Sequence, residues 1–297
     1  MAPQRIGFLH PGDMGISIAA AAQNAGNEAY WASEGRSPET QARATKYGLR
    51  DAHTLAQLCA ECAVIVSVCP PHAAEEVAQQ VLATGFDGMY LDANAIAPQR
   101  AVRIGADMAA AGIGFVDGGI IGGPAWAPGS TWLYLAGPQA DQIAACFAAG
   151  PLETQVLGAQ IGRASALKMC FAAYTKGTTA LLFAILATAE DLGVRRDLEQ
   201  HWQRDDPPFA DEVTQRVRRV TAKAWRFAGE MEEIAATFRS AGMPGEFHAA
   251  AANVYRRLAD FKADRSTPEL EDVLVALMRP GRERVENPEP RTENQMP

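Results

Sequence analysis

Residues 5–25 restrict the fold more than any other stretch, because they combine a strand, a glycine turn and a helix. The apolar burst at 6–9 is typical of a strand, and the alanine-rich run at 16–25 favours a helix. Glycine has no Cβ, so backbone amides and the positive end of a helix dipole can approach a pyrophosphate. The pattern predicts a dinucleotide-binding domain whose expected cofactor contacts are His10, Pro11, Gly12, Asp13, Met14 and Gly15.

The turn departs from the usual Gly-x-Gly-x-x-Gly fingerprint at its first position. Gly12 and Gly15 supply the second and third glycines, whereas His10 stands where the first is expected. Two glycines of three are weak evidence alone, and the sequence assigns no role to the histidine. The prediction therefore depends on the pattern that follows the turn.

Strand-like and helix-like segments alternate after the turn. Apolar runs occur at 27–33, 63–68, 89–92, 114–117 and 131–135. The run at 63–68 is continuously apolar, as expected of a parallel strand buried on both faces. The alternation predicts an α/β fold, with a Rossmann-type doubly wound parallel sheet over residues 1–162.

The composition changes to long helical patterns from Ser165 onward. Residues 165–192 are expected to form one long helix that Gly193 ends, with further helices at 210–240, 244–262 and 270–277. This predicts an all-α C-terminal domain over 163–280, joined to the sheet by the long interdomain helix. The polar, proline-containing residues 281–297 are expected to be a disordered tail.

Composition argues against several classes of partner. The net charge of −8 argues against nucleic acid, which needs clustered basic residues. The longest apolar stretch, 180–189, falls short of the roughly 20 residues of a membrane span, and no signal peptide is visible. Cys59 and Cys62 have metal-site spacing, but no second pair or nearby histidine completes it, so a helix end and no metal are expected. Five cysteines in a chain of this length suggest no disulfide framework and fit a reducing cytoplasm.

The end of the second strand bears on the choice of nucleotide. Glu34 occupies the acidic position that binds the ribose 2′-hydroxyl of NAD. Ser33, Arg36 and Ser37 form a group suited to the 2′-phosphate of NADP, because arginine presents a planar fork of donors. We expect NADP, and NAD remains the alternative.

Loops at the later strand ends hold further candidates. Cys69 and Pro70 end a buried strand in a stiff loop, and Asn94 follows the next strand. Ligands of open α/β sheets bind at this carboxyl edge. The glycine-rich segment 117–124 is expected to be a loop that lets the backbone approach a ligand or another chain segment.

With both halves considered, the chain resembles the β-hydroxyacid dehydrogenases. This superfamily includes 3-hydroxyisobutyrate dehydrogenase, 6-phosphogluconate dehydrogenase and, more distantly, imine reductases. The resemblance covers residues 5–262 and is carried by segments 6–15, 117–123 and 165–169. Segment 225–242 further resembles a branch of phosphogluconate-dehydrogenase-like proteins whose C-terminal domain is of unknown function.

The resemblance implies roles for particular residues. Lys168 matches the catalytic lysine near the start of the interdomain helix, and Gly122 and Gly123 match the substrate-binding loop. Asn94 falls where the family commonly carries serine, and is expected to contact substrate and cofactor. Glu233 roughly matches an acidic position that shapes the substrate pocket. The expected small-molecule substrate is a hydroxy acid or its keto form.

Two departures from the family pattern leave the substrate open. Ala172 stands where the family has a substrate-binding asparagine, and Ile121 replaces a serine. Loss of the asparagine and the serine makes the pocket less polar, so an imine reductase is an alternative, as is a cofactor-binding protein without turnover.

A lysine can serve as acid and base only if burial lowers its pKa from about 10.4. The expected apolar surroundings of Lys168 are Ala164, Ala166, Leu167, Phe171 and Ala172.

The helical half is also expected to form a homodimer. Leu181, Leu182, Ile185 and Leu186 give the long helix an apolar stretch. If these side chains are exposed in one copy, a second copy would complete the core.

Overall fold

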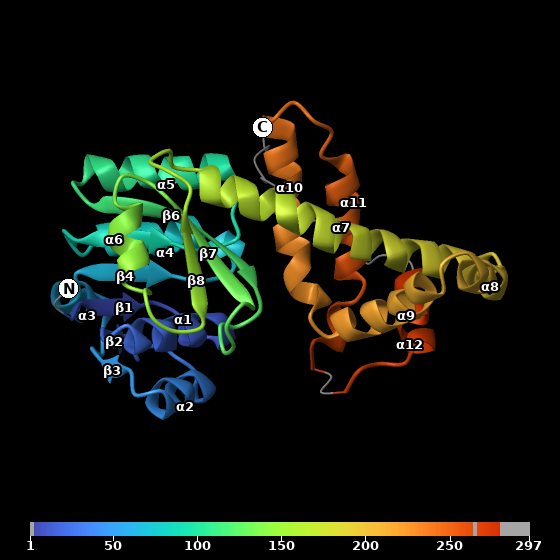
Figure 1. Cartoon of the computed structure of the whole chain (residues 1–297), viewed down its shortest axis with the longest axis horizontal. Coiled ribbons are helices and arrows are strands. Elements are labelled where there is room, and N and C mark those ends of the chain that lie inside the picture. Colours follow the sequence, from blue (N-terminus) through green and yellow to red (C-terminus); the bar gives the residue numbers. More distant parts are fainter. Residues whose placement is uncertain (1–2, 264–265, 280–297) are drawn as a thin grey trace, which may run out of the picture.

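The computed structural model describes residues 3–263 and 266–279 of the 297-residue chain. It has two lobes, and Figure 1 shows the sheet-containing lobe in blue to green and the helical lobe in yellow to red. Helix α7 (Arg163–Asp191) starts against the sheet and runs through the helical lobe. The expected tail, 281–297, lies outside the described residues.

The sheet confirms the Rossmann-type prediction. Its strand order is β3-β2-β1-β4-β5-β6-β7-β8, and neighbouring strands are parallel except β6 and β7. The antiparallel β7 corrects the expectation of a fully parallel sheet. The strands are β1 (Arg5–Phe8), β2 (Glu28–Trp31), β3 (Arg50–Asp51), β4 (Val64–Ser67), β5 (Met89–Asp92), β6 (Gly114–Gly122), β7 (Thr131–Ala136) and β8 (Leu152–Val156).

Helices cover both faces of this sheet. One face packs against α1 (Asp13–Asn24), α2 (Pro38–Lys46) and α6 (Ala140–Ala145), and the other against α3 (Leu55–Glu61), α4 (Ala74–Leu82) and α5 (Pro98–Ala110). Along β4, Val64 and Val66 enter the first core and Ile65 the second. Side chains alternate across a strand, so burial on both faces explains the unbroken apolar run. A short 3-10 turn, η1 (Pro71–Ala73), precedes α4.

The glycine-rich segment after Asp117 is a strand, which corrects the expectation of a loop. It continues β6 to Gly122 and pairs with β7. A Cβ on Gly119 would lie 2.6 Å from the carbonyl oxygen of Ala164, and one on Gly122, whose φ is 121°, would lie 2.2 Å from that of Ser130. These glycines therefore let α7 and β7 approach the strand.

The helical lobe consists mainly of α-helices. It contains α7, α8 (Arg195–Asp205), α9 (Pro207–Thr221), η2 (Ala224–Arg226), α10 (Phe227–Ser240), α11 (Glu246–Arg256), η3 (Ala259–Ala263) and α12 (Leu270–Met278). The long helix is continuous through Gly177 as predicted, and Gly193, with φ of 71°, follows its end. The single helix expected at 210–240 is two helices, because η2 separates α9 from α10.

Helix α7 supplies much of the core of this lobe. Leu182 and Leu186, expected on its exposed face, are buried against residues of α9 to α12, whereas Leu181 is exposed. By length and composition alone, α7 is apolar enough to cross a membrane, with a mean hydropathy of 1.4. Of the 18-residue window that meets this test, 44% is buried within the chain. The helix instead packs against β6, α10, α11 and α12.

Candidate active site

The predicted cofactor turn lies at the carboxyl edge of the sheet, between β1 and α1. Gly12 caps α1 and its N–H donates to the carbonyl oxygen of His10 at 2.8 Å. A Cβ on Gly15 would lie 2.2 Å from that same oxygen, so only glycine fits. A Cβ on Gly12 would meet nothing within 4 Å. The turn is therefore closed on its inner side and open at Gly12, the geometry that a phosphate group needs.

Two buried polar atoms beside this turn have no hydrogen-bond partner among the described residues. They are Nδ1 of His10 and Nε of Arg36. Burial, and then the positive charge of Arg36, lower the pKa of His10 to about 4. Burial also lowers the pKa of Arg36. Buried polar groups are normally paired, so these two atoms point to a bound polar group.

Arg36 also borders a cavity of ≈ 180 Å³ at the ends of β1 and β2. Its lining is Leu9, Ala32, Glu34, Arg36, Leu55, Val77 and Gln80. The cavity thus joins an arginine, an acid and an apolar floor. These residues fit a phosphorylated nucleoside better than they fit an uncharged ligand.

The other residues predicted to hold the 2′-phosphate already have partners in the chain. The Ser37 hydroxyl accepts from the N–H of Thr40 at 3.3 Å and caps α2. The Ser33 N–H donates to Asp51 at 3.2 Å. Of the predicted group, Arg36 is the residue with a buried side-chain donor that has no partner among the described residues.

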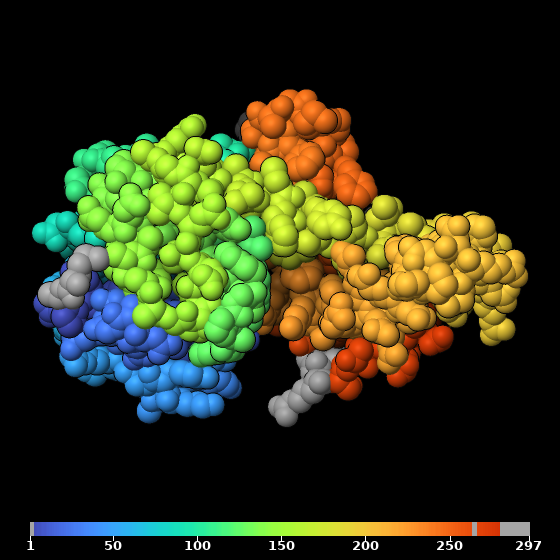
Figure 2. Space-filling view, in the orientation of Figure 1, coloured from blue at the N-terminus to red at the C-terminus, as the bar shows by residue number. Residues whose placement is uncertain are grey.

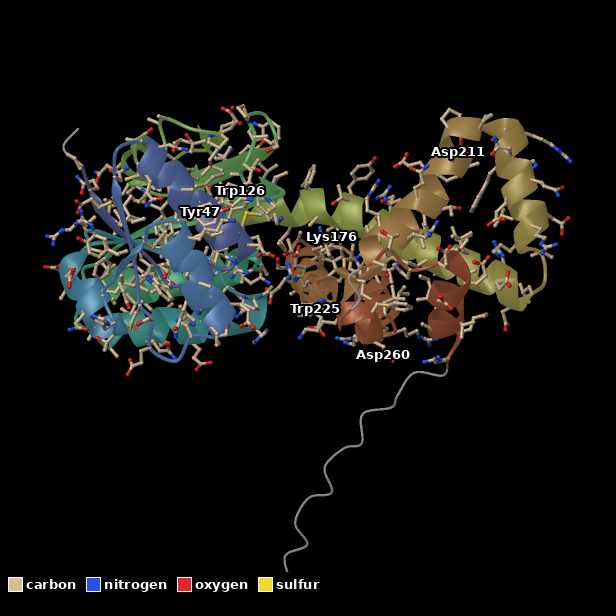
Figure 3. The ribbon with its side chains drawn as sticks, turned by 90° about the horizontal axis from the view of Figure 1, so that it is seen from below. Tyr47, Trp126, Lys176, Asp211, Trp225 and Asp260 are labelled. Atoms are coloured by element: carbon tan, nitrogen blue, oxygen red, sulfur yellow. The ribbon has the colours of Figure 1, made fainter. Side chains whose placement is uncertain are left out.

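Pro11 and Asp13 contact α2 through Arg43, although the side chain of Asp13 remains 60% exposed. Arg43 forms an ion pair with Asp13 at 3.1 Å and donates to the carbonyl oxygen of Pro11 at 3.3 Å. Nearby, the rings of Tyr47 and Trp126 stack with centroids 5.1 Å apart, and Figure 3 shows them side by side. The β6–β7 loop is thereby docked on α2 beside the turn. Met14 is partly buried against the sheet core.

Three buried polar side chains stand in a row across the carboxyl edge of the sheet. Ser67, Asp92 and Asp117 are register partners on β4, β5 and β6. Asn94 lies over this row: its Nδ2 donates to Ser67 at 3.1 Å and its Oδ1 accepts from the N–H of Cys69 at 2.6 Å. Asn94 therefore braces the predicted Cys69–Pro70 loop. Its side-chain oxygen has a partner within the chain.

The two aspartates of the row differ in their environments. Burial raises the pKa of Asp92 to about 7, the charge of Asp117 adds to the effect, and Asp92 Oδ2 has no partner among the described residues. Burial also raises the pKa of Asp117, although bonds from Ser165, Ala164 and Gly162 oppose the rise. These bonds hold the amino end of α7 against β6.

Lys168 lies one turn into α7, where the helix passes the sheet. A Cβ on Gly119 would lie 3.2 Å from Cβ of Lys168, so the glycine makes room for this approach. Burial, and then the charge of Lys176, lower the pKa of Lys168 to about 8, while Glu230 opposes the change. Within the described residues its amine makes no hydrogen bond or ion pair.

The apolar surroundings predicted for Lys168 are partly wrong. Leu167 and Phe171, four residues apart on one side of α7, are 37% and 43% exposed. Ala164 and Ala172 are buried as expected. The desolvation of Lys168 therefore comes from packing against β6 and the helical lobe.

Glu233 connects the lobes. One carboxylate oxygen accepts from the N–H of Ala97 at 2.8 Å, and the other forms an ion pair with Arg100, which also contacts Glu75 at 3.2 Å. Both oxygens of this predicted substrate residue thus bind the start of α5. Of the predicted glycine pair, Gly122 packs against β7, and a Cβ on Gly123 would meet nothing within 4 Å.

Sequence reasoning overlooked Glu230, the acid that faces the lysines of α7. It forms an ion pair with Lys176, whereas Glu232 pairs with Arg256 at the surface. Glu230 and Glu233 lie three residues apart on α10 and so share a helix face. That spacing distinguishes the two inward acids from Glu232.

Two family models match the chain, one in the sheet-containing lobe and one in the helical lobe. Residues 5–148 match the NAD binding domain of 6-phosphogluconate dehydrogenase, and residues 189–258 match a domain of unknown function, DUF1932. The chain therefore combines an NAD binding domain of the 6-phosphogluconate dehydrogenase type with a C-terminal domain of unknown function, the combination that the sequence resemblance predicted. No curated protein matches it.

Solved structures share the fold along most of the chain. The conserved protein MTH1747, of unknown function and similar to 3-hydroxyacid dehydrogenases, is 26% identical, with a TM-score of 0.65 over 87% of this chain and 98% of that one. The 3-hydroxyisobutyrate dehydrogenase of Mycobacterium tuberculosis is 17% identical, with a TM-score of 0.67 over 93% and 99%. A reductive aminase from Aspergillus terreus, solved with NADPH, is 17% identical, with a TM-score of 0.55 over 92% and 99%.

Proposed function

We propose that this chain is an NADP-dependent oxidoreductase that transfers hydride between nicotinamide and a small hydroxy acid or its keto form. Lys168 would act as the general acid and base. The observation that carries the proposal is the amine of Lys168, which is desolvated without a counterion of its own where α7 meets both lobes. The NAD-binding family match and the dehydrogenase-like fold support the class of reaction.

Different residues would bind the cofactor and transfer the proton. The turn at Gly12, with His10 and Arg36, would hold phosphate groups, and the brace from Asn94 would fix the loop at Cys69. A bound nicotinamide would supply or accept the hydride. In reduction, protonated Lys168 donates a proton to the carbonyl oxygen; in oxidation, its neutral amine accepts the hydroxyl proton. A pKa of about 8 keeps both forms accessible near neutral pH.

The proton role of Lys168 is tested by Lys168→Ala. Turnover would be followed by nicotinamide fluorescence over a panel of small hydroxy acids, keto acids and imines. We expect kcat to fall by roughly 10² to 10⁴, the usual contribution of general acid–base catalysis, with NADPH affinity unchanged. Lys223→Ala, at an exposed lysine, is the matched control. Unchanged kcat in Lys168→Ala would contradict the assignment.

Imine reduction is the second candidate. The apolar Ala172 and Ile121 replace polar residues of the dehydrogenases, and the fold is shared with a reductive aminase and with an imine reductase from Streptomyces aurantiacus. Reduction of imines but of no keto acid would favour this candidate. Absence of turnover with every substrate would favour a non-catalytic cofactor-binding protein. We propose a cytoplasmic location, which the five free thiols support.

A further inference from the structure

Two lysines of α7 interact electrostatically with the same acid on α10, and one of them contacts it directly. Lys176 forms an ion pair with Glu230, and the two side chains are only 16% and 15% exposed. The Lys176 amine also lies 4.7 Å from the ring centroid of Phe227. The hydroxyl of Tyr255 donates to the carbonyl oxygen of Lys176 at 2.7 Å. Figure 3 shows Lys176 on α7, within the helical lobe. The Lys176 amine is thus placed by Glu230 and Phe227, and the helix backbone at Lys176 by Tyr255.

A buried carboxylate needs a positive partner, and two amines are near enough to influence Glu230. Burial alone would raise the pKa of Glu230, but the charges of Lys176 and then Lys168 outweigh burial and leave it lowered. Lys176 holds the ion pair, so Lys168 is left without an acid of its own. Removing one member of a buried pair leaves the other uncompensated.

Among the other charged and titratable groups around this part of α7, His248 on α11 lies beside Gly177, its Nδ1 has no partner among the described residues, and burial lowers its pKa, which favours the uncharged ring. Asp117 on β6 bonds the amino end of the helix. Arg216 on α9 bonds Thr179 and the carbonyl oxygen of Thr175. Tyr255 on α11 has the bond described above. Glu230 is therefore the acid whose negative charge would stabilise the protonated form of Lys168.

We propose that Lys176 is a positioning residue that occupies the carboxylate of Glu230 and thereby keeps the amine of Lys168 free of a counterion. This inference rests on the proposed acid–base role of Lys168. Without Lys176, the negative charge of Glu230 would act on Lys168 alone and would stabilise its protonated amine. Lys168 would then be a poor base at neutral pH.

The ionisation of Lys168 can be measured without substrate or cofactor. The full chain is acetylated briefly with trace reagent over a pH series, and the reactivity of each lysine is read by tandem mass spectrometry. In Lys176→Met, we expect the midpoint of Lys168 to rise by on the order of one pH unit, a tenfold change in its neutral fraction at fixed pH. Adding Glu230→Gln to this variant should lower the midpoint again, because the acid that then acts on Lys168 is gone, and the rise that remains measures the lost repulsion from Lys176.

Three controls separate this effect from loss of packing. Lys176→Arg preserves the positive charge and should leave the midpoint unchanged. Glu232→Gln breaks a surface ion pair on the same helix and should also have no effect. Lys223, which is exposed, is an internal reference for reagent reactivity. Thermal melts would show that each variant is folded.

The outcomes test the positioning role of Lys176 and the proposed function of the chain separately. An unchanged Lys168 midpoint in Lys176→Met, or the same midpoint in Lys176→Met and in the double variant, would overturn the positioning role. If Lys176→Met does not fold, Glu230→Gln alone must not raise the Lys168 midpoint, and a rise there would equally overturn it. The expected shifts in a protein whose turnover does not depend on Lys168 would uphold the electrostatic role while rejecting the proposed function.

Discussion

At the residue scale, the chain places a weak acid at the centre of its buried polar row. Asp92 is fully enclosed, one of its oxygens accepts from Asn94 at 3.0 Å, and the other has no partner among the described residues. Its strand neighbour is the carboxyl group of Asp117. Two adjacent buried carboxyl groups resist double ionisation, so a proton is retained on Asp92 to higher pH than in solution.

This retention makes stability depend on pH through Asp92. Its folded pKa, about 7, lies above the ordinary value of 3.8, so the folded state binds this proton more tightly. The stabilising contribution is complete below the ordinary pKa and is lost as the pH rises toward 7, by up to about 1.4 kcal/mol per pH unit. Asp92→Asn should remove this loss, because its amide oxygen can still accept from Asn94 and it cannot ionise.

This pH dependence of stability is measured by urea unfolding between roughly pH 4.5 and pH 8, a range that spans most of the shift in the Asp92 pKa. Relative to wild type, Asp92→Asn should become progressively more stable as the pH rises. Asp141→Asn, at an exposed aspartate, should follow wild type at every pH. Identical pH profiles for wild type and Asp92→Asn would show that Asp92 is ionised throughout.

Some site residues could be predicted from sequence and others could not. Gly15 follows from the turn pattern, because its clash with His10 is local. Lys168 was found through family resemblance rather than through its neighbours, two of which face solvent. The pairing of Lys176 with Glu230 joins residues 54 positions apart, and no local pattern encodes it. Glu233 was placed in the substrate pocket, whereas its carboxylate binds α5.

At the element scale, α7 has an inner face that packs and an outer face that remains apolar. Leu167, Phe171, Tyr174 and Leu181 are all exposed. Their spacings of four, three and seven residues place them on one side of the helix. We propose that this outer face binds the same face of a second copy, which would give the expected homodimer.

Sedimentation at micromolar concentration tests the homodimer. Wild type should sediment as a dimer, and Phe171→Glu combined with Leu181→Glu should sediment as a folded monomer, because charge would be buried at the contact. Val275→Glu, at an exposed apolar residue of α12, is the control and should remain dimeric. A wild-type monomer would contradict the proposal.

The elements that sequence reasoning described best have strong local periodicity. The predicted bounds of β5 match, and α7 begins two residues before the predicted start. Edge strand β8 was overlooked because polar residues alternate along it and only part of it is buried. Strand β6 was cut short at Asp117, because its glycines suggested a loop when they serve close packing.

At the scale of the whole molecule, the proposed chemistry depends on contacts between lobes. Figure 2 shows the lobes divided by a notch below α7 on the viewed face. Helix α7 crosses from one to the other, and Glu233 on α10 binds Arg100 and Ala97 at the start of α5. The change from alternating to purely helical patterns was sufficient to predict two lobes. The contacts between them join distant segments, so they required the structure.

The central claim is that the sheet-containing lobe binds a nicotinamide nucleotide and that Arg36 selects the phosphorylated form. Fluorescence titration with NADPH and NADH, in wild type and Arg36→Ala, tests it most directly, with exposed Arg50→Ala as control. We expect tighter NADPH than NADH binding in wild type, and roughly 10- to 100-fold weaker NADPH binding in Arg36→Ala, because a charged hydrogen bond contributes about 1.5–3 kcal/mol. NADH affinity should change little. Binding of neither nucleotide to wild type, or equal loss of both in Arg36→Ala, would contradict the claim.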